Sequence, residues 1–159
     1  DIHCEAVASD FADLRFEGSG GISSRVDERG AIQVRAVPLD SIGDHLKPTT
    51  IKMDIEGGEV AAVDGAKNLI RRAMPVLAVC VYHSPDHFWM VPEILKGLCP
   101  HYGLYLRRYA EVPWELVCYA IPPHRRQPCR ERPGGGQGTG GMRERRGDNG
   151  FRHLNQDGG

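Results

Sequence analysis

The sequence predicts an α/β protein built on an open sheet that has a central parallel strand and ends in an antiparallel hairpin. The unbroken apolar run Val76–Tyr82 is typical of a central strand whose two faces are both covered. The shorter segment Thr50–Ile55 is followed by two glycines and an amphipathic stretch, which indicates a strand, a turn and a helix. Two further strand-like segments, 102–109 and 115–121, flank Val112-Pro113 and predict the hairpin.

The first third of the chain predicts extended structure. Its three candidate strands are Ile2–Val7, Ala12–Glu17 and Ala31–Val37. A glycine-rich loop, 18–21, lies between the second and the third. A short helical turn is expected at Leu39–Ile42, with Asp40 as a candidate N-cap because its carboxylate can accept backbone N–H bonds.

A helix is predicted after Gly57-Gly58, because glycine allows a sharp turn. Glu59 would stand in its first turn, where a negative charge suits the helix dipole. Gly65 falls inside this helix and costs about 1 kcal/mol relative to Ala, which predicts a close approach to the sheet. Pro75 ends the helix. The apolar stripe consists of Val60, Val63, Leu69, Ile70 and Ala73.

A second helix is expected to start with Ser84 as N-cap and Pro85 in its first turn, and to run to about Leu98. Its apolar residues recur at helical spacing, and Pro92 is expected to kink or restart it.

From Pro123 to Gly159, glycine and arginine dominate and apolar residues become sparse. Such a tail cannot bury enough surface to offset its ordering entropy, so we expect residues 123–159 to be disordered.

Composition limits the classes of function. The net charge is −1, but residues 1–122 carry 12 Lys and Arg against 17 Asp and Glu, which argues against a nucleic-acid partner. Five scattered cysteines without a C-x-x-C pair suggest reduced thiols in a cytoplasmic protein. No apolar run is long enough to span a membrane, so no membrane partner is expected.

These elements and their motifs resemble the FkbM family of methyltransferases over residues 1–122. The matching segments are Val37-Pro38-Leu39-Asp40-Ser41-Ile42, the K-x-D-x-E-G-x-E core at Lys52–Glu59, Gly65-Ala66, Pro75-Val76-Leu77, Val81-Tyr82-His83 and the closing strand Glu115–Ala120. The core motif is the most specific of these. The resemblance implies a class I, Rossmann-like S-adenosylmethionine methyltransferase sheet, present here as its C-terminal portion.

The resemblance also implies what the sequence does not contain. The family's front half carries a glycine-rich cofactor loop after its first strand and an acidic residue after its second, and neither is found here. In the resembling fold Ile2–Val7 is the third strand, so its neighbour and the neighbour of Thr50–Ile55 are expected to be absent. The expected fold is therefore an incomplete sheet with unpaired edges, which is a liability for solubility. By the resemblance, Asp54 and Val7 are the candidate cofactor-binding residues.

Asp54 and Glu56 follow the end of a predicted strand and point to the same face, which Lys52 shares. As site residues they would orient the cofactor or a substrate hydroxyl, or supply oxygen ligands to a metal ion. The structural alternative is that Glu56 caps the following helix while Asp54 pairs with Lys52. The residues alone favour the structural alternative, whereas with the family resemblance we favour a site role for both, and we predict no metal centre.

His83 lies at the end of the next predicted strand, at the same sheet edge as Asp54. Histidine is the side chain that can take a proton near neutral pH, so His83 is a candidate base toward an acceptor hydroxyl. The alternative is a histidine bonded to a loop carbonyl. His87 is four residues away, but Pro85 between them disfavours a shared metal ion. Phe88 and Trp89 are candidates for an acceptor pocket, although such a pair more often belongs to a core.

Two functions remain open. The first is S-adenosylmethionine-dependent O-methylation of a small molecule or sugar, in which catalysis is mostly alignment. The second is a truncated, non-catalytic fragment or interaction module that has lost cofactor binding. The G-x-G-x-x-G pattern at 136–141 has no preceding strand and is treated as coincidence. A weak contact of the Arg/Gly tail with RNA is the least favoured option.

Overall fold

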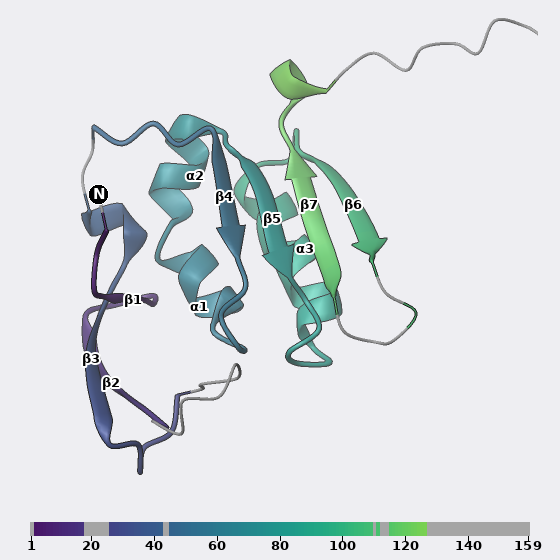
Figure 1. Ribbon diagram of the computed structural model, residues 1–159. Helices are drawn as coiled ribbons and strands as arrows, with labels where there is room; N and C mark the ends of the chain where they lie inside the picture. The colour runs from purple at the N-terminus through teal and green to yellow at the C-terminus, as the bar shows by residue number, and fades with distance from the viewer. Residues whose placement is uncertain (1, 18–25, 43–44, 110, 112–114, 127–159) are drawn as a thin grey trace, which may run out of the picture. The chain divides into compact units, whose positions relative to one another are not determined.

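The computed structural model describes residues 2–17, 26–42, 45–109, 111 and 115–126. Their strands form two separate sheets (Figure 1). The strands are β1 (Ala6–Val7), β2 (Ala12–Phe16), β3 (Ile32–Val37), β4 (Thr50–Met53), β5 (Val76–Cys80), β6 (Gly103–Arg108) and β7 (Leu116–Ile121). The helices are α1 (Glu59–Asp64), α2 (Lys67–Ala73) and α3 (His87–Leu98), with short 3-10 helices η1 (Leu39–Ser41) and η2 (Pro123–Arg125).

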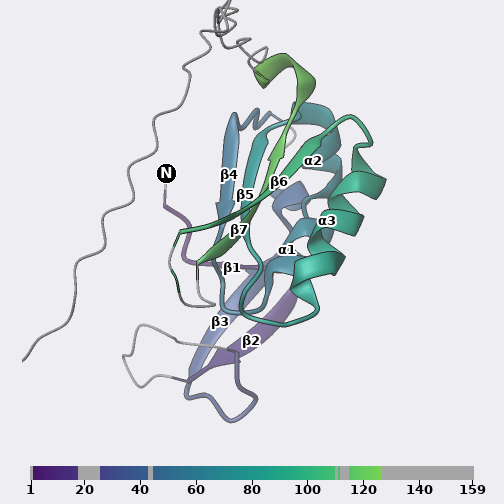
Figure 2. The ribbon, with the colours of Figure 1, turned by 90° about the vertical axis from the view of Figure 1, so that its right-hand side faces the viewer.

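The second half of the chain forms a four-stranded sheet in the order β4-β5-β7-β6. β4 and β5 are parallel, and β7 runs antiparallel to both of its neighbours, β5 and β6. The apolar run that ends in Tyr82 is therefore a central strand, as predicted, but the prediction that helices cover both of its faces is wrong for the described part of the chain, where they lie on one face (Figure 2). The hairpin of β6 and β7 is also confirmed, whereas its turn at 112–114 lies outside the described residues.

Helices α1, α2 and α3 lie on one face of this sheet (Figure 2). The single helix predicted after Gly58 is in fact two, because the chain breaks at Gly65-Ala66. A Cβ atom on Gly65 would lie 2.0 Å from the carbonyl oxygen of Ala8, so the break coincides with a very close contact. The predicted close approach is confirmed. α2 ends at Met74, which has a left-handed φ of 46°.

α3 begins at His87 with Asp86 as its N-cap, so the predicted start at Ser84-Pro85 is wrong. Ser84 instead accepts a backbone hydrogen bond from His87 in the turn that precedes the helix. Pro92 lies inside one continuous helix, and the predicted restart does not occur.

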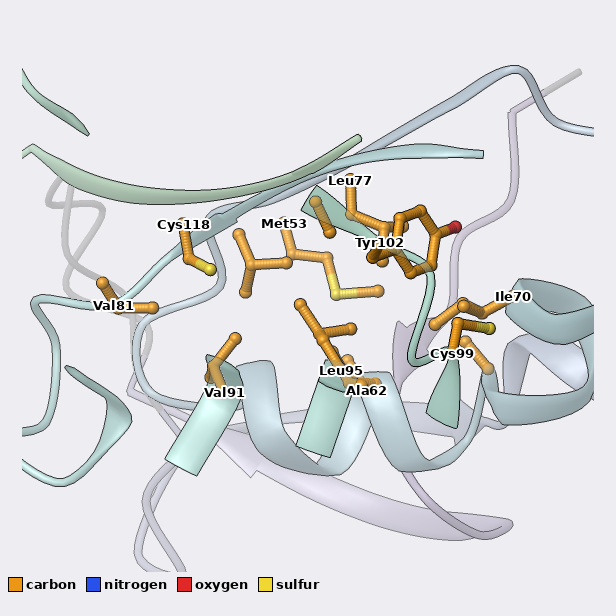
Figure 3. Close-up of a cluster of buried hydrophobic side chains, with 14 residues drawn as sticks. Met53, Ala62, Ile70, Leu77, Val81, Val91, Leu95, Cys99, Tyr102 and Cys118 are labelled. Carbon is orange, nitrogen blue, oxygen red and sulfur yellow. The ribbon is translucent and has the colours of Figure 1, made fainter. Parts of the chain in front are cut away.

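The main core lies between the four-stranded sheet and its helices (Figure 3). Leu77 of β5, Met53 of β4 and Leu95 of α3 are among its buried members. Tyr102 is also buried and donates a hydrogen bond from its hydroxyl to the carbonyl oxygen of Pro75, 2.7 Å away. This core fixes the ends of β4 and β5, and these ends carry the candidate site.

The first half of the chain forms a three-stranded sheet in the order β1-β3-β2. β1 is parallel to β3, and β2 is antiparallel to it. β2 and β3 agree with their predicted ranges, but the predicted strand Ile2–Val7 shrinks to its last two residues. Only the end of β3, Ala36 and Val37, is fully buried in the strands of this sheet.

Asp40 connects this first half to the helices, in a way that corrects its predicted role. It does not cap η1, whose N-cap is Pro38. Its carboxylate instead accepts hydrogen bonds from the backbone N–H groups of Asn68 (3.0 Å) and Leu69 (2.7 Å), in the first turn of α2. Its own N–H donates to the carbonyl oxygen of Gly65 at 2.8 Å.

Four strands lie at an edge of their sheet within the described part of the chain: β1 and β2 in the three-stranded sheet, and β4 and β6 in the four-stranded sheet. Two of them are the strands for which unpaired edges are expected: β4 pairs only with β5, and β1 pairs only with β3. The expectation of unpaired edges at these two strands therefore agrees with the structure.

The predicted tail from 123 to 159 lies outside the described residues from 127 onward, whereas Pro123–Arg125 form η2. In the segments that are described, no helix has the length and apolarity needed to cross a membrane.

Candidate active site

The corner between β4 and α1 has an unusual backbone. Glu56 and Gly57 both have positive φ, 53° and 103°. This conformation suits Gly57 but strains Glu56, because a left-handed residue with a Cβ atom costs roughly 1–2 kcal/mol. Gly58 has an ordinary φ of −81°, so only the first of the two glycines is required by the turn. The carboxylate of Glu56 lies 3.7 Å from Nε2 of His83, which follows the end of β5.

Glu59, the first residue of α1, is fully buried. Its carboxylate reaches back over the turn and accepts backbone hydrogen bonds from Ile55 (3.0 Å) and Gly57 (3.1 Å). A buried carboxylate needs such partners, because an unpaired buried charge is very costly. Glu59 therefore holds the corner together from inside, and it does far more than interact with the helix dipole.

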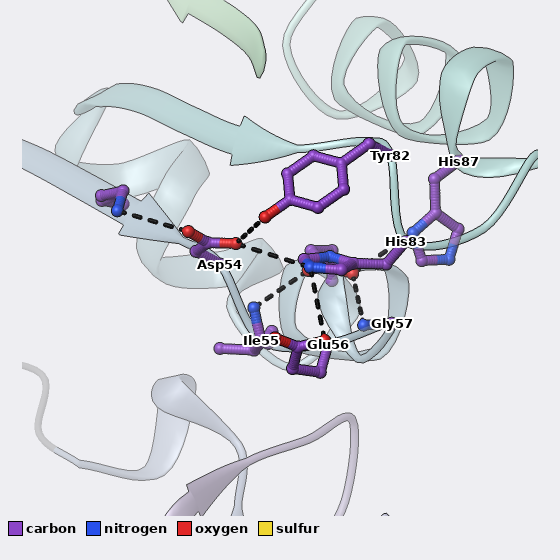
Figure 4. Close-up of polar contacts among 9 residues, drawn as sticks. Asp54, Ile55, Glu56, Gly57, Tyr82, His83 and His87 are labelled. Atoms are coloured by element: carbon purple, nitrogen blue, oxygen red, sulfur yellow. Dashed lines mark hydrogen bonds and ion pairs between the residues drawn. The ribbon is translucent and has the colours of Figure 1, made fainter. Parts of the chain in front are cut away.

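Two histidines, His83 and His87, lie within ion-pair distance of Glu59, and both rings are drawn in Figure 4. His83 Nδ1 lies 2.7 Å from Oε1 of Glu59 in a hydrogen bond. His87 Nδ1 lies 3.2 Å from Oε2, a distance that suits an ion pair, but it does not have the direction of a hydrogen bond. Both imidazoles are more than nine-tenths buried. Because a carboxylate only accepts hydrogen bonds, we assign the proton of neutral His83 to Nδ1, which leaves a lone pair on Nε2.

The free nitrogen of His83 faces the two acids that the sequence analysis selected. Nε2 lies 3.6 Å from Oδ1 of Asp54 and 3.7 Å from Oε2 of Glu56. It is buried and has no hydrogen-bond partner among the described residues. A buried polar atom without a partner is rare in folded proteins and points to a ligand or a water molecule that would complete it.

Asp54 lies at the centre of a polar network on the face of the sheet opposite the helices. It accepts a hydrogen bond from the hydroxyl of Tyr82 at 3.0 Å and lies 3.5 Å from the ammonium of Lys52. Partial burial by itself would raise the pKa of Asp54. Hydrogen bonds from Cys80 and Tyr82, with the charges of Lys52 and His83, outweigh burial and bring this pKa below its ordinary value. Asp54 therefore remains a carboxylate at neutral pH.

The donors to Asp54 are held in their protonated forms. Burial, followed by the interaction with Asp54, raises the pKa of the Cys80 thiol to about 12. The same two causes raise the pKa of the Tyr82 hydroxyl to about 12. Neither group is a nucleophile or a base near neutral pH. His83 is thus the group of this network best suited to accept a proton.

The structure brings three of the four predicted site residues together: Asp54, Glu56 and His83. Val7 belongs to the three-stranded sheet, where it packs against the edge of the core, and its cofactor role stays a prediction. Phe88 and Trp89 are about half exposed, so the interpretation that they belong to a core is wrong.

The sequence analysis did not select Glu59, Tyr82 or His87 as members of the candidate site. One signal was available for Glu59, because an acid two residues after a left-handed turn can accept the N–H groups of that turn. Among the residues that the structure describes, no group of three or more His, Cys, Asp or Glu side chains is arranged to hold a metal ion.

Comparisons with known proteins agree with the motifs. The family model described as methyltransferase FkbM domain matches residues 1–110. A crystal structure of methyltransferase FkbM from Methylobacillus flagellatus KT is similar, with a TM-score of 0.61 and 25% sequence identity. The match covers 76% of this chain but 28% of that one. A search of curated proteins finds none that matches. With a family model that matches more than half of its length, the chain belongs to the FkbM methyltransferase family.

Proposed function

We propose that this chain provides the acceptor side of a methyltransferase site, at which a methyl group passes from S-adenosylmethionine to a hydroxyl oxygen of a small molecule or sugar. The observation that carries the proposal is the free, buried Nε2 atom of His83, which lies beside two carboxylates and is backed by Glu59. A hydroxyl group placed between these atoms would complete the hydrogen bond that Nε2 lacks.

The roles of the residues follow from their positions. His83 would accept the proton of the acceptor hydroxyl at Nε2, while the oxygen forms its bond to the methyl carbon and the bond from that carbon to the cofactor's sulfur breaks. Glu59 keeps the ring oriented through Nδ1 and stabilises the imidazolium that forms, together with the carboxylates of Asp54 and Glu56. Holding the two reactants in line supplies most of the remaining rate enhancement.

The cofactor fits the charge of this edge. The FkbM family is generally S-adenosylmethionine-dependent, and the cofactor supplies a methyl group on a positively charged sulfonium. The carboxylates of Asp54 and Glu56 provide a negative potential where such a cation would lie, so we assign Asp54 to the cofactor as well as to the acceptor. We keep Val7, at the end of β1, as the second cofactor-side residue.

The proposal extends to the class I fold. The order β4-β5-β7-β6, with an antiparallel strand between two others, supports the interpretation that this sheet is one half of a class I methyltransferase sheet. The free edges of β1 and β4 in the described part of the chain are where further strands of such a sheet would pair. The match to 28% of the similar structure is consistent with this arrangement.

The same free edges favour the second candidate, a non-catalytic fragment or interaction module. An exposed strand edge is a template for pairing with another polypeptide. Under this alternative the chain would bind a partner through β4 or β1 and would not bind the cofactor. Calorimetric titration of the chain with S-adenosylmethionine separates the two, because micromolar binding contradicts the alternative.

The direct test is methyl transfer by the complete product of the gene that encodes this chain. We expect transfer from labelled S-adenosylmethionine to hydroxyl acceptors. Replacement of the base in His83→Gln should lower kcat by roughly 10²–10⁴-fold, while the KM for the cofactor changes little. The matched control is His101→Gln, an exposed histidine outside the site. Unchanged turnover in His83→Gln would show that His83 is not the catalytic base. Absence of both methyl transfer and cofactor binding would support the non-catalytic alternative.

A further inference from the structure

We propose that the hollow on the outer face of the β6–β7 hairpin is a binding site for a sugar ring that carries an acidic group. The hollow has a volume of about 630 Å3. It is lined by Tyr105, Leu106, Arg107, Tyr109, Tyr119 and Ile121. Three tyrosines and one arginine make it different from the other hollows of the described surface.

The strand register explains why these side chains gather. Tyr105 and Arg107 are two residues apart on β6 and so share one face, and Tyr109 follows directly after the end of that strand. Tyr105 is directly opposite Tyr119 on β7. The next residues of β7, Cys118 and Ala120, point the other way and belong to the core beneath the helices. The tyrosines therefore lie on the face of the sheet that no described helix covers.

The rings of Tyr105 and Tyr109 are available to a ligand, since each residue is about half exposed. Their flat apolar surfaces suit the C–H face of a sugar ring, while the hydroxyl groups offer hydrogen bonds. The hydroxyl oxygens of Tyr109 and Tyr119 lie 2.6 Å apart. One of them donates to the other, so the second keeps its proton for a ligand oxygen.

Arg107 supplies the charge. Its guanidinium carbon lies 5.3 Å from the centre of the Tyr109 ring, in a cation–π arrangement. The hydrogen bond with Tyr109 raises the pKa of Tyr119, and the positive charge of Arg107 opposes that rise. No acidic side chain in the described segments pairs with Arg107. A carboxylate or phosphate on the ligand would be the partner that this guanidinium lacks.

One end of the hollow, at Tyr109, lies at the same end of the sheet as the proposed base. The N–H of Tyr109 donates to the carbonyl oxygen of Glu115, and the N–H of Val81 donates to that of Leu116. Tyr109 is thus two strands away from the segment that carries His83, or about 10 Å at normal strand spacing. A bound ring could extend one hydroxyl toward His83. That the ring is the methyl acceptor rests on the proposed function, whereas its binding does not.

The test is a titration of the isotopically labelled chain with D-glucuronate, followed through the backbone amide signals by NMR. We expect millimolar binding with shifts centred on β6 and β7, and D-glucose should bind about 10-fold more weakly because it has no charge for Arg107. Arg107→Gln should remove this difference. Arg108→Gln is the matched control, because it deletes the same charge from the neighbouring residue on the opposite face.

Tyr105→Ala provides a second, independent variant, since an exposed ring can be removed without disturbing the core. It should weaken glucuronate binding about 2- to 10-fold. The proposal is overturned if glucuronate leaves β6 and β7 unchanged, if glucose binds equally well, or if the flat acid 4-hydroxybenzoate binds more tightly than glucuronate. Glucuronate binding that persists in His83→Gln supports the hollow even if methyl transfer is never found. A failure of the proposed function would thus be distinguished from a failure of this one.

Discussion

The two sheets of this chain are stabilised in different ways. The four-stranded sheet is covered on one face by three helices, and nearly all fully buried apolar residues belong to this unit. The three-stranded sheet has no helix of its own and is mostly exposed on β2 and on the first half of β3. Its firmest contacts with the rest of the chain are at Asp40 and Gly65.

The difference shows where the fold can carry chemistry. A site that must orient a buried histidine to within a few tenths of an ångström needs a rigid support, and the four-stranded sheet provides it through its core. The three-stranded sheet carries ion pairs as well, but they are half exposed. Matched substitutions in the two sheets can therefore measure how much burial contributes.

The largest contrast is expected between two glutamates. Glu59→Ala removes a buried carboxylate that holds two backbone N–H groups and two histidines, and it should lower the free energy of unfolding by about 3–5 kcal/mol. Glu5→Ala removes a carboxylate that also lies beside a histidine and an arginine, at 3.6 and 3.8 Å, but it is partly exposed. Its cost should stay below about 1 kcal/mol. Urea denaturation of both variants makes the comparison, and equal costs would contradict the structural role of Glu59.

A smaller contrast is expected between two leucines. Leu77→Ala opens a cavity in the middle of the main core and should destabilise by about 2–5 kcal/mol. Leu14→Ala removes the same atoms from β2, where the side chain is only half buried, and should cost about half as much or less. Thermal unfolding followed by circular dichroism measures both. A Leu14 variant as unstable as the Leu77 variant would show that the first sheet has a core of its own.

These contrasts also explain which parts of the structure could be predicted from the sequence. The strand ends at Asp54 and His83 were predictable, because parallel neighbouring strands end at one edge whatever covers them. β5 and the β6–β7 hairpin were predictable from apolar runs and turn residues. Local patterns were sufficient for these features, since each depends on residues that are close in sequence.

Features that depend on distant contacts were not predictable. The helix break at Gly65 depends on the carbonyl of Ala8, and Asp40 caps α2 instead of its own turn. Glu59 was interpreted as a first-turn acid, because its burial and its contacts with His83 and His87 exist only once α3 is in place. A linear pattern shows the residue types at such positions but not the partners that tertiary structure gives them.

The link between the two sheets gives a third prediction. Asp40→Ala deletes the carboxylate that accepts from Asn68 and Leu69, and loss of a helix cap costs about 0.5–2 kcal/mol. Because the cap also joins η1 to α2, hydrogen exchange should accelerate at β2 and β3 more than at β5. Asp40→Asn should retain part of the protection, since its amide oxygen still accepts one bond. Uniform acceleration over both sheets would show that Asp40 stabilises α2 without holding the first sheet.

The smallest effect concerns pH. The pKa of Asp54 is lowered in the folded chain, so its contribution to stability is present above the unfolded pKa, near 3.8, and is lost as the pH falls through the folded value. Asp54→Asn should therefore leave a shallower decline of stability as the pH falls below the unfolded pKa, by less than about 1 kcal/mol because the side chain is more than one-third exposed. Asp13→Asn, on the exposed β2 strand, is the matched control. Denaturant titrations at several pH values measure this decline. If both variants and the parent chain show the same decline, the hydrogen bonds from Cys80 and Tyr82 do not stabilise the ionised form of Asp54. The carboxylate of Asp54 is then less preorganised than its geometry indicates.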